Sequence, residues 1–282
     1  MCFILIETDS ADLTLIARCA ILIKMKKTYR DVLAIILVIA ALSVLAVFDF
    51  CTLKLSDDQT LNKLINDVIP RICGGVLLFF VLILIEYKGV LIPEKENFFK
   101  NLLWCLPCYL VVLANFPFSA LICGNATIDR ADLIWLFILK CLAISLMEEM
   151  LFRGLLQSVI YESFEKNKYK NLITVAVTSA IFGGIHLFNL FAGAGVGATF
   201  LQVGYSFLIG AMLSAVLIKT KNIWLCVLLH AVFDIGGLIV TDLGSGPFQD
   251  TCFWVLTAVC GVICLAYILY FLLKNQKPDN ND

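Results

Sequence analysis

The stretch CLAISLMEEMLFRGLLQSVI (residues 141–160) contains two adjacent carboxylates, Glu148 and Glu149, and one guanidinium, Arg153, among almost wholly apolar neighbours. About 20 consecutive apolar residues form a helix long enough to cross a bilayer. An ionisable side chain inside such a helix is costly and usually faces an interior cavity that has a function. The stretch therefore predicts a transmembrane helix that contributes charged groups to an interior site.

The composition of the whole chain agrees with a membrane protein. The 282 residues are 61% hydrophobic and 15% charged, whereas a soluble domain is about 25% charged. The apolar residues are grouped into long runs, which is typical of a multi-pass membrane protein. The net charge is −1, so nothing in the charge indicates a nucleic-acid partner.

Eight long apolar runs are candidates for membrane spans. Their continuity differs from the alternating pattern of a transmembrane β-barrel, and only helices or closed barrels cross a bilayer. We therefore expect an all-α fold, a multi-pass transmembrane helical bundle of about eight spans. The runs are 32–48, 69–86, 102–123, 133–161, 171–190, 203–218, 223–241 and 252–273.

The basic residues between the runs predict the orientation, because cytosolic loops carry an excess of Lys and Arg. With eight spans, fourteen basic residues fall on one side and four on the other. This asymmetry predicts that both termini lie in the cytosol. The fourteen are Lys24, Lys26, Lys27, Arg30, Lys88, Lys95, Lys100, Lys166, Lys168, Lys170, Lys219, Lys221, Lys274 and Lys277, and the four are Lys54, Lys63, Arg71 and Arg130.

The chain divides into four parts on this basis. Residues 1–31 form an N-terminal segment without the features of a signal peptide, and we expect translation to start at Met25. Residues 32–129 hold the N-terminal transmembrane helices, 130–241 the core that contains the charged stretch, and 242–282 the last helix and a cytosolic tail.

Two local motifs have ordinary explanations. The Gly-rich segment 191–200 is expected to be a flexible connection that can act as a gate, because no strand precedes it as nucleotide-binding loops require. Cys105 and Cys108 form a CxxC motif inside an apolar run. We interpret these cysteines as small apolar residues, with redox or metal chemistry as the alternative.

Seven ionisable residues lie deep in the runs. They are Lys140, Glu148, Glu149, Arg153, His186, His230 and Asp234, and they include both histidines of the chain. At about 1.5 Å per helical residue, Glu148 lies about 21 Å from the cytosolic edge, His186 about 22 Å, His230 about 12 Å and Asp234 about 18 Å. Four polar groups from three helices therefore lie within one range of depth in the membrane, which predicts a common site.

Helical spacing separates the roles of these groups. Glu149 and Arg153 are four residues apart and are expected to pair on one face. Glu148 lies about 140° around the helix from Arg153, so it is left without this cation and suits a general base acting on water. Lys140 is expected to be structural and to extend toward the outer edge of the bilayer.

Three motifs follow in order along the chain: Glu148-Glu149-x-x-x-Arg153, Phe182-x-x-x-His186 and His230-x-x-x-Asp234. Residues 130–241 that contain them resemble the CPBP family of intramembrane endopeptidases, also called the Abi family, which includes CAAX proteases and bacteriocin-processing proteins.

The resemblance implies an intramembrane peptidase of the glutamate type, without a cofactor. By its motifs, Glu148 and His186 activate water, while His230 and Asp234 hold the oxyanion. Asp234 departs from the Asn of the eukaryotic CAAX enzymes, and an ionised Asp cannot donate a hydrogen bond. Asp234 is therefore protonated, orients His230 or binds a metal. We favour orientation of His230, because the two residues are four apart on a helix.

Several alternatives remain open from the sequence. Glu148, His186, His230 and Asp234 are also suitable zinc ligands around an activated water. A non-catalytic bacteriocin-immunity or peptide-binding protein, or a transporter, would also place polar groups in a membrane cavity. The leading interpretation is a peptidase in a bacterial plasma membrane, with a membrane-associated peptide or protein and the lipid bilayer as its partners.

Overall fold

The computed structural model describes residues 27–50, 54–93 and 96–276. The expected start at Met25 and most of the expected N-terminal segment lie outside the described residues. The regular secondary structure of the described chain is helical, apart from one two-residue antiparallel bridge between β1 and β2. The expected all-α fold is therefore confirmed.

The helices are α2 (Lys27–Phe50), α3 (Gln59–Leu84), α4 (Phe98–Trp104), α5 (Leu106–Ala114), α6 (Phe118–Ile122), α7 (Ile134–Glu149), α8 (Gln157–Ser163), α9 (Lys170–Ile185), α10 (Val196–Thr220), α11 (Ile223–Leu243) and α12 (Thr251–Lys274). Three short 3-10 helices are η1 (Lys88–Leu91), η2 (Ala131–Leu133) and η4 (His186–Leu190), and η3 (Met150–Leu156) is a π-helix. The two strands are β1 (Thr127–Ile128) and β2 (Gly244–Ser245).

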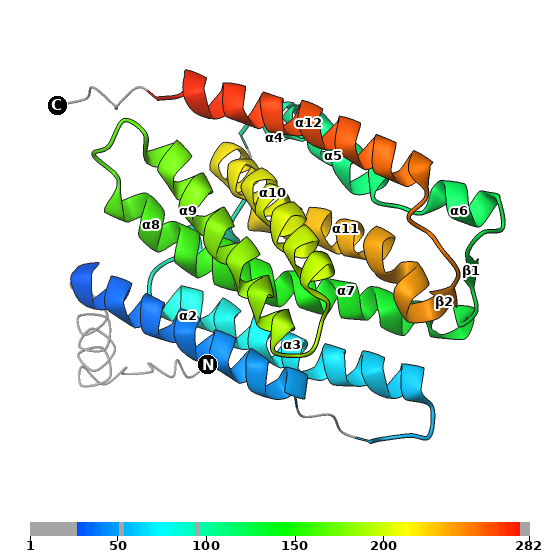
Figure 1. Ribbon diagram of the computed structural model, residues 1–282. Helices are drawn as coiled ribbons and strands as arrows, with labels where there is room; N and C mark the ends of the chain where they lie inside the picture. Colours follow the sequence, from blue (N-terminus) through cyan, green and yellow to red (C-terminus); the bar gives the residue numbers. More distant parts are fainter. Residues whose placement is uncertain (1–26, 51–53, 94–95, 277–282) are drawn as a thin grey trace, which may run out of the picture.

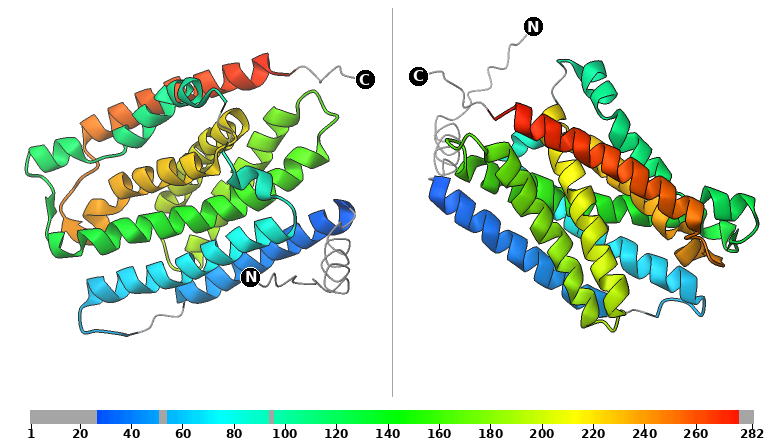
Figure 2. Two further views of the ribbon diagram at one scale, coloured as in Figure 1. Left: turned by 180° about the vertical axis from the view of Figure 1, so that it is seen from behind. Right: turned by 45° about the horizontal axis from the view of Figure 1, so that its top comes forward.

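The helices form a bundle with α7 and α11 near its centre (Figure 1). Helix α7 packs against α3 on one side and α11 on the other, α9 packs against α10, and α12 packs against α5. Figure 2 shows the same order from behind, with α7 between α3 and α11. The motifs of the sequence thus come from helices in the interior of the bundle.

Five helices of the described chain are long and apolar enough to cross a membrane: α3, the α9–η4 segment, α10, α11 and α12. This supports a multi-pass membrane protein. The expected single span at 102–123 is wrong, because α4, α5 and α6 divide this run. The breaks fall at Cys105, just before Pro107, and at Pro117, and proline cannot donate a backbone hydrogen bond to the preceding turn.

The expected long helix over 133–161 is present as α7, η3 and α8 in succession. The π-helical turn of η3 begins directly after Glu149. A π turn holds one more residue than an α turn and is frequent at functional sites. The π turn therefore changes which side chains that follow Glu149 in the sequence face the interior of the bundle.

Helices α9 and α10 approach each other closely at Gly183. A Cβ atom added there would lie 2.8 Å from the carbonyl oxygen of Val203 and 3.1 Å from the backbone nitrogen of Phe207. Only glycine permits this approach without moving a backbone. The contact holds the end of α9, where His186 lies, against α10.

The connection between α9 and α10 runs from Phe191 to Gly195 and contains Gly193 at a φ of +87°. This left-handed conformation favours glycine. The sixth run begins earlier than expected, since α10 starts at Val196 rather than at residue 203.

Candidate active site

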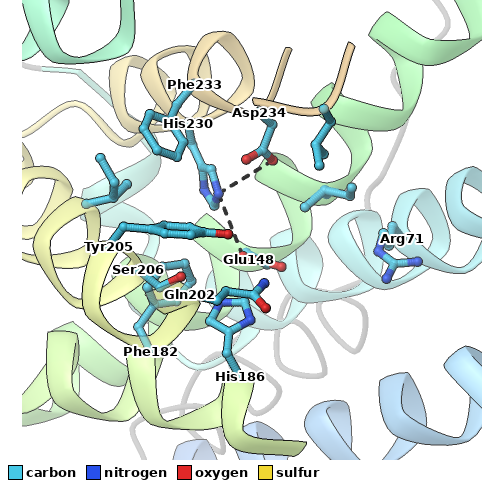
Figure 3. Close-up of a pocket in the computed structure, with 13 residues that line it drawn as sticks. Arg71, Glu148, Phe182, His186, Gln202, Tyr205, Ser206, His230, Phe233 and Asp234 are labelled. Carbon is cyan, nitrogen blue, oxygen red and sulfur yellow. Dashed lines mark ion pairs between the residues drawn. The ribbon is translucent and has the colours of Figure 1, made fainter. Parts of the chain in front are cut away.

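A cavity of about 190 Å³ lies among α3, α7, α9, α10 and α11. It is large enough for several water molecules, each of which occupies about 30 Å³. Figure 3 shows its polar side chains converging from these helices. The cavity is lined by Arg71, Ile144, Glu148, Phe182, His186, Gln202, Tyr205, Ser206, Ile209, His230, Phe233, Asp234 and Leu238. The four polar residues that share a depth in the sequence therefore line one cavity.

Glu149 and Arg153 form the expected ion pair behind the cavity. The Arg153 Nη1 donates to Glu149 Oε1 over 3.0 Å, and both side chains are buried. The second guanidinium nitrogen donates to the carbonyl oxygen of Gly210 over 3.2 Å. The guanidinium carbon also lies 4.6 Å from the centre of the Phe182 ring, within the range of a cation–π contact.

Glu149 also orients His230. The Nδ1 atom of His230 lies 2.7 Å from Glu149 Oε1, within hydrogen-bond distance. A fully buried carboxylate accepts this hydrogen bond when Nδ1 carries the proton. The Nε2 atom is then the ring nitrogen that faces the cavity.

This geometry differs from the expected orientation of His230 by Asp234. The Oδ2 atom of Asp234 lies 3.6 Å from Nε2, at ion-pair distance and beyond an ordinary hydrogen bond. The expectation counted only the four-residue spacing within α11. It could not include Glu149, which reaches His230 from another helix at a shorter distance.

Glu148 has the separate environment that its position in the helix predicts. Its side chain is 24% exposed and lines the cavity, whereas that of Glu149 is 0% exposed. Its Oε2 atom lies 3.8 Å from His230 Nε2. Glu148 and Asp234 thus approach the same ring nitrogen (Figure 3).

His186 faces the cavity from the first residue of η4. It makes no hydrogen bond or ion pair to Glu148 within the described chain, although both residues line the cavity. The ring of Phe182 makes edge-to-face contacts with both histidines, with ring centres 5.8 Å from His186 and 5.9 Å from His230. Phe182 therefore contacts both imidazoles and the guanidinium of Arg153, and it lines the cavity while Arg153 does not.

Lys140 lies outside the cavity, as its structural interpretation requires, but it does not extend to the edge of the bundle. It is 5% exposed, and its Nζ atom lies 2.8 Å from Asp67 Oδ2 and 2.8 Å from Asp242 Oδ2. Asp242 also pairs with the exposed Lys63 over 2.6 Å. These ion pairs join α3, α7 and α11, the helices that surround the site.

The sequence interpretation missed four polar residues of the cavity. Arg71 lies in α3 and also pairs with Asp67. Gln202, Tyr205 and Ser206 lie three or four positions apart on α10, so they share one helical face. This spacing indicates a polar face on the helix. The sequence interpretation does not include it, because residue 202 lies outside the predicted span 203–218 and none of the three residues is charged.

The CxxC cysteines are buried apart from the site, and Cys108 Sγ lies 4.0 Å from Cys264 Sγ. Across the described ranges, no group of three or more His, Cys, Asp or Glu side chains is arranged to hold a metal ion. The four alternative zinc ligands therefore do not fit a metal centre in this geometry, and we derive no step through zinc.

A cavity inside a bundle of apolar helices brings carboxylates and two histidines together, as in a hydrolytic site. A comparison of the chain with models of protein families gives a match. Residues 130–236 match the family described as Type II CAAX prenyl endopeptidase Rce1-like. This match contains all three motifs and confirms the resemblance to the CAAX-protease family over the segment. It supports peptidase activity in a multi-pass membrane protein. No curated protein and no solved structure matched the chain.

Proposed function

We propose that this protein is an intramembrane endopeptidase that hydrolyses a peptide bond of a membrane-associated peptide or protein. The observation that carries the proposal is the convergence of Glu148, His186, His230 and Asp234 on one cavity inside the bundle. A partly exposed carboxylate, two imidazoles and room for water are the groups that base-catalysed hydrolysis needs.

In the proposed reaction, Glu148 is the general base and His186 helps to position the attacking water. As the water oxygen bonds to the peptide carbonyl carbon, the proton of the water passes to the Glu148 carboxylate. Collapse of the tetrahedral intermediate breaks the C–N bond, and Glu148 returns the proton to the leaving nitrogen. Catalysis is of the glutamate type and needs no metal.

Glu149 and Arg153 act as positioning residues in this reaction. Glu149 holds His230 so that Nε2 faces the cavity, and Arg153 balances the buried charge of Glu149. The pair orients the imidazole before substrate arrives, as preorganised electrostatic catalysis requires.

We further propose that the protein lies in a bacterial plasma membrane with both termini in the cytosol. Two observations support this orientation. Lys170 and Lys221, from different connections, both lie near the ring of Tyr161 at one end of the bundle. Arg130, from the other set of connections, pairs with Asp58 at the N-terminus of α3. Labelling of single cysteines added at the termini tests the orientation.

The test of function compares peptide termini in membranes that contain the wild type or Glu148→Gln at equal abundance. New N- and C-termini formed only by the wild type establish proteolysis and identify the substrate. Glu165→Gln is the matched control, because it makes the same substitution in an exposed turn. Identical profiles for the wild type and Glu148→Gln contradict the proposal.

CAAX prenyl proteins, which the family description implies, are one substrate class within this proposal. Bacteriocin precursors, which the resemblance to the CPBP family implies, are another. The same comparison of termini distinguishes them. An immunity phenotype that survives both Glu148→Gln and His186→Ala would instead identify a non-catalytic peptide-binding protein.

A further inference from the structure

Peptide hydrolysis through a tetrahedral intermediate needs hydrogen-bond donors for the negative oxygen that forms on the carbonyl carbon. The family resemblance gives part of this task to residue 234, where an Asn would donate through its amide. Here residue 234 is Asp, and an ionised carboxylate only accepts hydrogen bonds. With an ionised Asp234, the cavity therefore needs a hydrogen-bond donor elsewhere.

His230 meets this need only in part. Its Nδ1 atom is engaged with Glu149, so a neutral ring that donates there presents an acceptor at Nε2. A protonated ring does donate from Nε2, but the carboxylates of Glu148 and Asp234 already lie within 4 Å of that atom. Both compete with the oxyanion for the same proton.

We propose that Tyr205 is a further catalytic residue, which donates its phenolic hydrogen to the oxyanion. Tyr205 lies on α10 and lines the cavity with Glu148, His230 and Asp234. Figure 3 shows its side chain across the cavity, with the hydroxyl directed toward Glu148 and His230. Within the described chain the hydroxyl makes no hydrogen bond, so the donor is available.

Tyr205 is 42% exposed, and one aromatic contact to Phe233 supports its ring without using its hydroxyl. The ring centre lies 6.2 Å from that of Phe233 at an interplanar angle of 49°. Phe233 directly precedes Asp234 on α11, so this aromatic contact couples the position of the phenol to the third motif. A phenylalanine at position 205 preserves the contact and removes only the donor.

Two other cavity residues have donors but are less well placed. Gln202 lies beside His186 in Figure 3, on the side where the attacking water is proposed to bind, and its Oε1 atom accepts from Asn189 over 2.8 Å. Ser206 is 4% exposed and has a shorter side chain. The site proposed for the oxyanion is the part of the cavity beside Tyr205 and His230.

This inference rests on the proposed peptidase function. During attack, the water oxygen bonds to the carbonyl carbon, the carbonyl π electrons move to the oxygen, and the proton of the water passes to Glu148. Tyr205 keeps its proton and shares it in a hydrogen bond, so the step needs no further reactant. When the intermediate collapses, the hydrogen bond weakens again.

The experiment measures kcat and KM of Tyr205→Phe on a synthetic peptide that spans the cut found by comparing membrane termini. We expect kcat to fall about 10²- to 10³-fold, as for other oxyanion donors, with KM within about twofold of wild type. Tyr267→Phe is the matched control, because Tyr267 packs against Trp104 on the other side of the bundle. Its kinetics should equal wild type.

The outcomes separate this inference from the proposed function. If wild type produces no termini beyond those of Glu148→Gln, the proposed function fails and this inference fails with it. If wild type is active, Glu148→Gln is inactive and Tyr205→Phe keeps its kcat, only the role of Tyr205 is overturned. A loss of kcat in Gln202→Leu but not in Tyr205→Phe overturns it too, and moves the donor to Gln202.

Thermal unfolding distinguishes catalysis from a structural role. An unchanged unfolding temperature of Tyr205→Phe with a lower kcat supports the donor. A lower unfolding temperature with kcat and KM changed together contradicts it. As a second variant, fluorinated tyrosine at position 205 keeps a donor, and it should restore most of the kcat that phenylalanine loses.

Discussion

Replacement of Arg153 by methionine tests the charge balance behind the site. The variant leaves the Glu149 carboxylate, which is 0% exposed, with His230 as its remaining partner. Removal of one member of a buried ion pair costs about 3–5 kcal/mol. The cation–π contact with Phe182 and the hydrogen bond to Gly210 belong to the same side chain and do not add independently. We therefore expect a loss of about 3–5 kcal/mol in the free energy of unfolding.

The assay is equilibrium unfolding in detergent micelles, followed by helical circular dichroism. Arg130→Met is the matched control, because Arg130 pairs with Asp58 in a solvent-screened position, where an ion pair contributes little to stability. In the double variant Arg153→Met/Glu149→Gln the buried charge is gone, so much of the lost stability should return. A loss below about 1 kcal/mol for Arg153→Met, or no recovery in the double variant, would refute the reasoning.

Three further predictions concern packing, pH and metal. Gly183→Ala should destabilise the protein by about 1–3 kcal/mol through overpacking, because the added Cβ would lie 2.8 Å from the carbonyl oxygen of Val203. Gly184→Ala should be near neutral or slightly stabilising, because nothing packs within 4 Å of its added Cβ. Thermal unfolding of both variants checks this contrast. The hydrogen bond from Arg130 lowers the pKa of Asp58 to about 2. The ionised Asp58 therefore stabilises the fold above its ordinary pKa of about 4, and this stabilisation is lost as pH falls through about 2. The melting temperature of the wild type should drop over this pH window, and that of Asp58→Asn should drop less. Purified active enzyme should contain far less than one zinc per chain and should keep its activity after chelation; near-stoichiometric zinc together with loss of activity would contradict the metal-free mechanism.

The composition of the interior site was predictable because burial of charge in a membrane is costly. Glu148, His186, His230 and Asp234 are polar positions in apolar helices, and their shared depth predicted the common cavity that the structure contains. The Glu149–Arg153 pair was predictable for a local reason, since four-residue spacing on a helix fixes which side chains meet.

Contacts between helices were not predictable in the same way. The hydrogen bond from His230 to Glu149 depends on how α11 packs against α7, and the spacing within α11 favoured Asp234 instead. The division of the run over 102–123 does not follow from its apolar composition, because the breaks come from Pro107 and Pro117 within it. Tyr205 was missed because a tyrosine in an apolar helix gives no signal of the direction of its hydroxyl.

The adjacency of Glu148 and Glu149 has a physical reason in this arrangement. Neighbouring residues on a helix point about 100° apart, so one turn can send one carboxylate into the cavity and the other into the protein interior. Glu149 can remain charged there because Arg153 lies beside it, and it can then fix His230 through Nδ1. Glu148 lacks that direct ion pair, and it faces the cavity where water is available. A single carboxylate could not do both, because an oxygen held by Arg153 and His230 is a poor acceptor for the proton of an attacking water. The pair therefore separates positioning from base catalysis within two consecutive residues, and exchange of Glu149 for Gln should impair the orientation of His230 while leaving the base in place.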